Sequence, residues 1–148
     1  MPSTYLSLNY HLVFSTKDRR PWIDAAWRER LHAYLGGCIK TSGGLPDAVG
    51  GVADHVHFLV GLRATHRLCD VLEEIKRESS KWIHRELGLR EFAWQEGYAP
   101  ITVSPGLRAK AKRYIARQEA HHRKLTLIEE LRDFLAKAEI EYSEKYLL

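Results

Sequence analysis

The sequence predicts an α+β fold: a ferredoxin-like split β-α-β unit with a central antiparallel sheet, helices on one face and further helices at the C-terminus. Hydrophobic periodicity changes along the chain in the order strand, helix, strand, strand, helix, strand. The 148 residues match the size of one compact domain. A content of 45% hydrophobic and 28% charged residues is typical of a globular protein. We therefore expect one domain over 1–148, with its core at about 5–124.

The first strand and helix follow from an alternating pattern and a capping residue. From Tyr5 to Thr16 apolar and polar residues alternate, which is typical of a half-buried strand. Asp24 is placed to cap a helix whose apolar residues have helical spacing, and Gly43-Gly44 ends that spacing. One helix therefore follows the first strand.

Two strands are expected in the middle of the chain. Leu45–Val52 is the weaker candidate, because Pro46 and Gly50-Gly51 interrupt it. The clearest strand, Ala53–Leu62, follows directly, so we expect the two to form a hairpin.

A long amphipathic helix and a short strand complete the sheet unit. Apolar residues form one stripe from about His66 to Leu87, and Gly88 is a typical helix stop. Ile101–Ser104 is expected to be the last strand. In this topology the first and third strands are central neighbours, so their polar faces should lie side by side.

Two further helices should follow the sheet unit. Ser104 as N-cap and Pro105 at the first helical position predict a helix that reaches about Lys124. Thr126 has capping-box spacing to the glutamate three residues later, which predicts a terminal helix over about 126–142.

Composition also bears on location and partners. No apolar run approaches the roughly 20 residues of a membrane span, and the N-terminus lacks the layout of a secretory signal, so we expect a cytoplasmic protein that makes no membrane contact. Cys38 and Cys69 lie in helix-like patterns and are expected to be buried thiols. The net charge of +4 favours a polyanionic partner.

Two histidines stand together on the clearest strand. Val56, Phe58 and Val60 share one face, which leaves His55 and His57 on the other. Imidazoles two residues apart on a strand can converge on one metal ion. Taken alone, the short pattern favours two ordinary surface-facing histidines.

The helix after Ser104 adds a tyrosine to this picture. Tyr114 and Gln118 stand four residues apart and share a face, with His121 and His122 one turn further along. A phenolic oxygen can attack phosphorus, although it is mostly protonated at neutral pH and needs help. A divalent cation beside the phosphate can supply that help.

With these residues in place, the chain resembles the single-tyrosine transposases of small insertion sequences, in the HUH (histidine, hydrophobic, histidine) nuclease superfamily. The transposases associated with repeated extragenic palindromes are related. The resemblance spans about residues 5 to 124 in order. Its matching segments are Tyr10–Lys17, Asp54–Val60, Ile75-Lys76 with Ser79–Trp82, Trp94–Tyr98, and Arg113–Ile115 with Gln118.

The resemblance implies a metal-dependent DNA transposase that cleaves and rejoins single-stranded DNA at hairpin-flanked element ends. It implies that His55, His57 and Gln118 bind Mg²⁺ or Mn²⁺, and that Tyr114 is the nucleophile. The product would be a 5′-phosphotyrosine and a free 3′ hydroxyl. His121 stays an alternative to Gln118 as third ligand. The expected partners are single-stranded DNA hairpins and a second copy of the chain in a homodimer, with the tyrosine acting in cis or in trans.

Three groups of basic residues are candidate phosphate contacts. Charged helix faces are also common without a ligand, so a solvated surface is the alternative for each group. One group follows the first strand, one lies on the long helix, and one surrounds the tyrosine. They are Lys17, Arg19 and Arg20; Lys76, Arg77 and Lys81; and Lys110 and Arg113.

Three other functions remain open at this point. A domesticated relative that nicks palindromic repeats would have the same chemistry. A non-catalytic single-stranded nucleic-acid-binding module could use the same sheet, although the strand carries His55 and His57 where such a surface uses aromatic residues. A two-histidine phosphoesterase would need a second histidine motif, and the sequence holds one His-x-His.

Overall fold

The fold is built on one antiparallel sheet. The computed structural model describes residues 4–147, so residues 1–3 and 148 of the predicted domain lie outside the described residues. The sheet has the strand order β2-β3-β1-β4. Its strands are β1 (Asn9–Ser15), β2 (Leu45–Gly51), β3 (His55–Gly61) and β4 (Ala99–Thr102). The predicted class and the central pairing of the first and third strands are confirmed.

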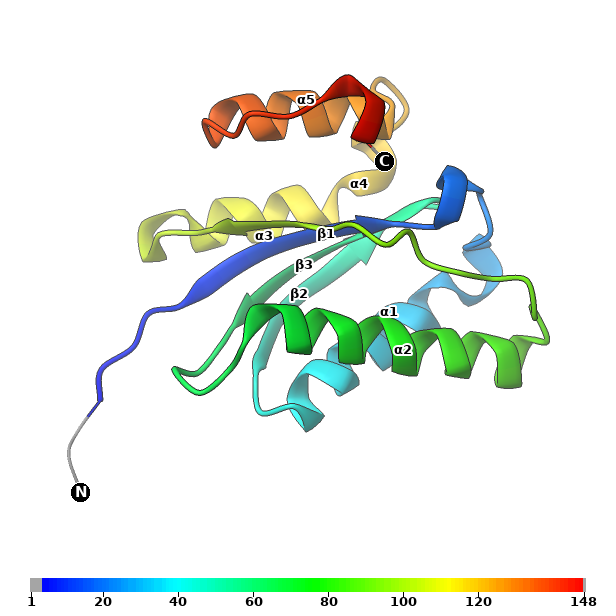
Figure 1. The fold of residues 1–148 in the computed structure, drawn as a ribbon, viewed down its shortest axis with the longest axis horizontal. Helices are drawn as coiled ribbons and strands as arrows, with labels where there is room; N and C mark the ends of the chain where they lie inside the picture. The colour runs from blue at the N-terminus through cyan, green and yellow to red at the C-terminus, as the bar shows by residue number, and fades with distance from the viewer. Residues whose placement is uncertain (1–3, 148) are drawn as a thin grey trace.

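Two long helices cover one face of the sheet (Figure 1). They are α1 (Ala25–Thr41) and α2 (Leu68–Leu87). Apolar side chains of β1 and β3, among them Phe14 and Phe58, pack with both helices into the main core. The other face of these two strands is therefore left for a different set of elements.

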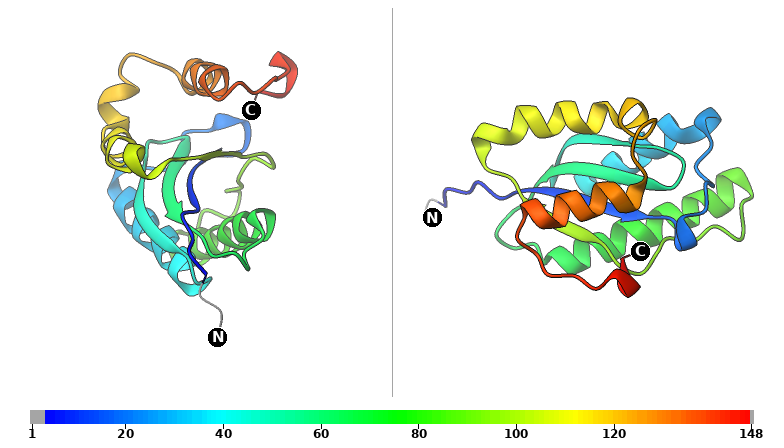
Figure 2. Two further views of the ribbon diagram at one scale, coloured as in Figure 1. Left: turned by 90° about the vertical axis from the view of Figure 1, so that its left-hand side faces the viewer. Right: turned by 90° about the horizontal axis from the view of Figure 1, so that it is seen from above.

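The C-terminal helices cover that second face (Figure 2). A short 3₁₀ turn, η2 (Pro105–Leu107), leads into α3 (Arg108–Ala116), α4 (Gln118–His121) and α5 (Leu127–Lys137). A second apolar cluster joins Val13 of β1 to Leu127, Leu131 and Leu147. Two more 3₁₀ turns are η1 (Lys17–Arg19) and η3 (Glu144–Tyr146).

Several local signals are confirmed. The Asp24 side chain accepts a hydrogen bond from the Ala26 amide and caps α1. Thr126 accepts from the Glu129 amide and caps α5. Gly88 ends α2 with a left-handed φ of 67°. Each of these residues has the conformational freedom or acceptor that its position requires.

Strand boundaries differ from the prediction for a pairing reason. The first strand begins at Asn9 instead of Tyr5, because its partner β3 ends at Gly61, which pairs with Asn9. Tyr5 therefore has no strand beside it and is 92% exposed. The last strand is Ala99–Thr102, two residues earlier than predicted, because these residues pair with β1.

The helix predicted from Ser104 to Lys124 is interrupted. The Ser104 side chain makes no capping bond, and a 3₁₀ turn precedes α3. At Arg117 the backbone leaves the helical region (φ −103°, ψ 20°), and its amide bonds the Tyr114 carbonyl three residues back. The terminal helix ends at Lys137, before a left-handed Glu139 with φ 58°.

Three smaller observations complete the fold. Cys69 is exposed and Cys38 is half-buried, so the prediction of two buried thiols is wrong for Cys69, which lies near the start of α2. Each outer strand carries a proline: Pro46 lies at a register shift in β2, and Pro100 pairs with Leu12. Within residues 4–147, no helix is both long and apolar enough to cross a bilayer.

Candidate metal centre and tyrosine site

Three histidines lie on the sheet face that α3 to α5 cover. His11 of β1 and His55 and His57 of β3 are all buried, with exposed fractions of 4%, 0% and 0%. The alternation of strand side chains puts Val56 and Phe58 into the main core and turns the histidines to the opposite face. The predicted juxtaposition of polar residues from the two central strands is therefore present.

Each imidazole of the pair on β3 is held by its Nδ1 atom. Nδ1 of His55 lies 2.7 Å from Oδ1 of Asp54. Nδ1 of His57 lies 2.8 Å from Nε2 of His11. These contacts fix the ring orientations and turn both Nε2 atoms toward α4 and α5.

The close approach of α3 to β2 brings the tyrosine helix onto this face. A Cβ on Gly50 would lie 2.5 Å from the Ile115 carbonyl oxygen, so only glycine fits there. The break at Arg117 then points Gln118 inward, where it is 1% exposed. Its Oε1 lies 3.2 Å from Nε2 of His55 and 3.0 Å from Nε2 of His122.

A glutamate that the sequence analysis did not single out lies at the centre of the cluster. Glu130 of α5 is 2% exposed. Its Oε1 is 3.0 Å from Nε2 of His57, 3.4 Å from Nε2 of His55 and 3.3 Å from Nε2 of His122. Its Oε2 accepts a short hydrogen bond from the Tyr114 hydroxyl. One carboxylate therefore joins the histidines to the tyrosine.

His121 is the histidine that faces the tyrosine. Nε2 of His121 lies 3.2 Å from the Tyr114 hydroxyl and 3.2 Å from Oε2 of Glu130. The residues placed to bind a metal include His122 instead of His121. Ligand atoms of His55, His57, His122 and Glu130 all lie within 4.8 Å of one another. Imidazole nitrogen and carboxylate oxygen are common donors to divalent metals, so this group suits such an ion.

The electrostatics of the cluster keep the tyrosine protonated. Burial and the hydrogen bond to Glu130 raise the pKa of Tyr114 well above its ordinary value. Burial alone would raise the pKa of Glu130, but its contacts with His122, His55 and His57 outweigh burial and hold that pKa far below its ordinary range. The carboxylate is therefore an anion, and the phenol keeps its proton.

The histidines themselves divide into two classes. Burial lowers the pKa of His57 to about 4 and that of His11 to about 3, so both rings are neutral. Burial also disfavours the charged form of His55, but Asp54 and Glu130 outweigh it and raise the pKa of His55 to about 9. A cation between these carboxylates is thus electrostatically favoured.

Comparison with known proteins assigns the family. A family model described as "Transposase IS200 like" matches residues 4–118, which is most of the chain. The chain belongs to the IS200-like transposase family. The resemblance stated from the sequence is therefore confirmed. A search of curated proteins finds no match.

Solved structures share the fold of this transposase. A candidate transposase from Deinococcus radiodurans R1 has 24% identity and a TM-score of 0.63, over 80% of this chain and 96% of that one. A REP-associated tyrosine transposase, bound to a REP hairpin, has 14% identity and a TM-score of 0.60, over 82% of this chain and 74% of that one. At these identities the likeness concerns the fold.

A basic groove runs beside the transposase tyrosine. It has a volume of about 710 Å³ and includes Tyr114 and His121 in its wall. Four of its eight lining residues are cationic and none is acidic: Lys110, Arg113, Arg117 and Lys124. Two of the predicted phosphate contacts, Lys110 and Arg113, therefore lie next to Tyr114.

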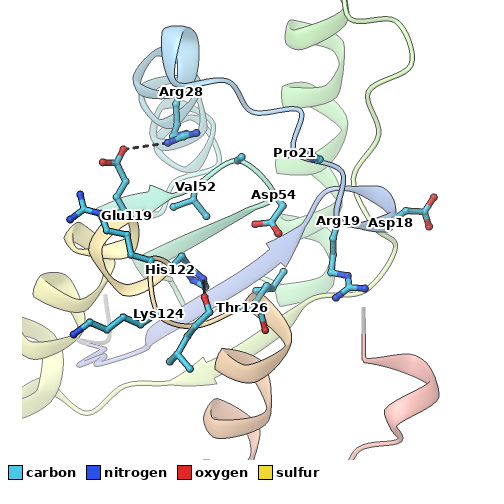
Figure 3. Close-up of a pocket in the computed structure, with 14 residues that line it drawn as sticks. Asp18, Arg19, Pro21, Arg28, Val52, Asp54, Glu119, His122, Lys124 and Thr126 are labelled. Atoms are coloured by element: carbon cyan, nitrogen blue, oxygen red, sulfur yellow. Dashed lines mark hydrogen bonds and ion pairs between the residues drawn. The ribbon is translucent and has the colours of Figure 1, made fainter.

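A second pocket of about 760 Å³ reaches the cluster from the other side (Figure 3). Asp54 and His122 line it, and Figure 3 shows both side chains turned toward its centre. Arg19 also lines the pocket, while Arg28 pairs with Glu119 at 3.3 Å. Lys17 and Arg20 are exposed close by in sequence, on η1 and directly after it.

The basic residues of α2 are not brought to the tyrosine. This helix packs on the opposite face of the sheet (Figure 1). The Lys76 ammonium donates to the carbonyls of Gln95, Glu96 and Gly97 at 2.7, 3.1 and 2.8 Å. Arg77 and Lys81 form ion pairs along the helix with Glu78, at 3.5 and 3.7 Å. Lys76 therefore binds the loop at residues 95–97 to α2.

Proposed function

We propose that this transposase cleaves and rejoins single-stranded DNA at hairpin-flanked element ends through a 5′-phosphotyrosine on Tyr114. The observation that supports the proposal most directly is the contact chain from Tyr114 through Glu130 to His57 and His55. It gathers a nucleophile and a metal-binding group in one buried cluster. Together with the family, this arrangement favours strand transfer over passive nucleic-acid binding.

The metal in this proposal is Mg²⁺ or Mn²⁺, held by His55, His57 and Gln118. The amide oxygen of Gln118 faces Nε2 of His55 at 3.2 Å, which suits a shared cation. When bound, such an ion neutralises phosphate oxygens and stabilises the charge that develops during attack. The choice of Mg²⁺ or Mn²⁺ rests on the family resemblance, because imidazole ligands by themselves favour softer ions.

The residues of the chain divide the cleavage step among them. The Tyr114 oxygen attacks phosphorus, the bond from phosphorus to the 3′ oxygen breaks, and the leaving oxygen takes up a proton to become a 3′ hydroxyl. Oε2 of Glu130 accepts the hydrogen bond from the phenol and is placed to take its proton, and Nε2 of His121 lies 3.2 Å from the same hydroxyl. Rejoining reverses the step, with a 3′ hydroxyl as the attacking group.

The basic groove would carry the DNA strand. Lys110 and Arg113 flank Tyr114 there and are placed to contact phosphates on either side of the scissile bond. Arg19, with Lys17 and Arg20, would contact the strand beyond the cluster. The structural neighbour that is bound to a REP hairpin supports a hairpin as the substrate class.

The proposal includes a homodimer of this chain. Within the described chain, Tyr114 meets Glu130 and the histidine pair of the same molecule. Cleavage in cis is therefore the arrangement that this geometry supports, and a dimer would act in pairing two DNA ends.

A denaturing gel for the covalent intermediate tests the proposal. The parent protein with Mn²⁺ and a single-stranded hairpin oligonucleotide should give a protein–DNA adduct, and Tyr114→Phe should give none. Tyr146→Phe is the matched control, since that tyrosine is 77% exposed and lies outside the cluster. An adduct that persists in Tyr114→Phe would show that another residue is the nucleophile.

A further inference from the structure

Each of the three imidazoles closest to Oε1 of Glu130 has a contact at its outer nitrogen, Nδ1. Nδ1 of His122 lies 2.8 Å from the Leu125 carbonyl, which can only accept, so this nitrogen carries the proton. Nδ1 of His55 likewise faces the Asp54 carboxylate. Nδ1 of His57 faces Nε2 of His11. The inner Nε2 atom of each ring is therefore the one that an ion would bind, with the outer nitrogen held by its neighbour.

All three Nε2 atoms lie close to the same carboxylate oxygen. Oε1 of Glu130 lies 3.0, 3.4 and 3.3 Å from Nε2 of His57, His55 and His122. A buried carboxylate requires a positive charge or hydrogen-bond donors beside it, and a metal ion among these nitrogen atoms would supply that charge. Glu130 is 2% exposed, so water contributes little to that compensation.

The three distances from Oε1 of Glu130 fit a tetrahedral ion, and all four ligand atoms lie within 4.8 Å of one another. Bonds of about 2.0–2.1 Å to nitrogen and oxygen imply ligand atoms about 3.3 Å apart around a tetrahedron. The three contacts of Glu130 Oε1 match that edge. The outer contacts of the rings also match the usual support of metal-bound histidines, where a carboxylate or carbonyl holds the second nitrogen.

We propose that His55, His57, His122 and Glu130 form a four-ligand site for a transition-metal ion of the Zn²⁺ class, in which α5 supplies the closing ligand. This inference rests on the metal dependence proposed above and changes its ligand set, because His122 and Glu130 join the pair instead of Gln118. Three imidazoles and one carboxylate suit Zn²⁺ or Co²⁺ better than Mg²⁺, which prefers six oxygen ligands.

The closing ligand gives the site a second property. A site with four protein ligands has no open position, whereas a catalytic site keeps one for water or substrate. Glu130 therefore occupies the place that a DNA phosphate takes, and its other oxygen holds the Tyr114 hydroxyl. Metal binding in the absence of DNA should fasten α5 over the site, and substrate must displace Glu130 from it.

Co²⁺ titration of the chelator-stripped full chain tests the site, because the visible absorption of Co²⁺ distinguishes four-coordinate from six-coordinate geometry. We expect an intense tetrahedral spectrum for the parent and at least a tenfold weaker Co²⁺ affinity for Glu130→Gln and for His122→Ala. Glu129→Gln, an exposed neighbour on α5, is the matched control and should bind Co²⁺ as the parent does.

A measurement on the unaltered chain guards against variants that fail to fold. Hydrogen exchange of the parent with and without Zn²⁺ should show slower exchange of the α5 amides (Leu127–Lys137) when Zn²⁺ is present. A weak six-coordinate spectrum, parent-like Co²⁺ affinity in Glu130→Gln, or unchanged exchange in α5 would each overturn the inference.

These outcomes are separable from those of the proposed function. The adduct assay tests Tyr114, and its result does not depend on which residues bind the metal in the absence of DNA. If the parent forms the adduct and Glu130→Gln still binds Co²⁺ as tightly as the parent, the four-ligand site is wrong and strand cleavage by Tyr114 stands. If Co²⁺ binds as expected and Tyr114→Phe still forms an adduct, the nucleophile assignment is wrong and the metal site stands.

Discussion

The contact between Gly50 and α3 determines how close Tyr114 comes to the histidines. Gly50 pairs with His57 across β2 and β3, and α3 lies directly over it. A Cβ added in Gly50→Ala would lie 2.5 Å from the Ile115 carbonyl oxygen, against an ordinary contact of at least 3.4 Å. The helix must therefore move by about 0.9 Å, the difference between these distances.

Such a displacement has two measurable costs. Overpacking of this kind typically costs about 1–3 kcal/mol of unfolding free energy. A misplacement of about 1 Å at a reacting group can slow catalysis about a hundredfold. We expect both effects in Gly50→Ala, because the backbone that clashes belongs to the residue next to Tyr114.

Urea unfolding and the single-turnover rate of adduct formation measure the two costs separately. Gly37→Ala is the control. Gly37 lies inside α1, and a Cβ there meets no atom within 4 Å, so this variant should gain about 0.5–1 kcal/mol of unfolding free energy. If Gly50→Ala is as stable as Gly37→Ala and forms the adduct at the parent rate, the close approach does not position the tyrosine.

Three further predictions concern stability. Ser79→Ala removes the buried acceptor of the Trp94 indole N–H and should cost about 1–3 kcal/mol in urea unfolding, while the neighbouring Ser80→Ala should cost under about 0.5 kcal/mol; equal costs would refute this. Lys76→Met leaves three loop carbonyls without their donor, so proteolysis at 95–97 should accelerate; an unchanged cleavage rate would argue against the anchor. Burial lowers the pKa of His32 to about 4, so between pH 6.5 and 4 the unfolded chain binds this proton and the native chain does not. Stability should therefore decrease as the pH is lowered from 6.5 to 4, and His32→Gln should reduce the slope by about 1 kcal/mol per pH unit; parallel pH profiles would refute this.

Local signals predicted most of the framework, because local physics decides it. The alternation that placed His55 and His57 on one face is a property of any extended chain, and the opposite face packs into the core as expected. The Asp24 cap and the Gly88 stop act within one turn of their own positions. Elements of this kind can be placed without knowledge of the tertiary fold.

Gly50 shows where local reasoning was misleading. In the sequence, Gly50-Gly51 weakens the case for a strand. In the structure the same glycines lie in β2, and the absence of a side chain at Gly50 admits α3. The reason for the residue lies 65 positions away, at Ile115, and only the tertiary contact reveals it.

Glu130 was missed for a related reason. It comes four residues after the Thr126 cap and resembles the acidic first turn that many helices have. One available signal was its position among Leu127, Leu131 and Phe134, on the stripe that packs against the sheet. A charged residue on an apolar stripe is rarely buried without partners, and here the partners come from one strand, β3, from α3, and from α4 and the residue that follows it.

The prolines of the two outer strands bear on how copies of this protein can associate. Pro46 in β2 and Pro100 in β4 have no amide hydrogen, so each lateral margin of the sheet offers an interrupted ladder of donors. Proteins use this device against edge-to-edge aggregation. An assembly of two molecules would accordingly form through side chains on helical surfaces more readily than by merging their sheets into one continuous layer.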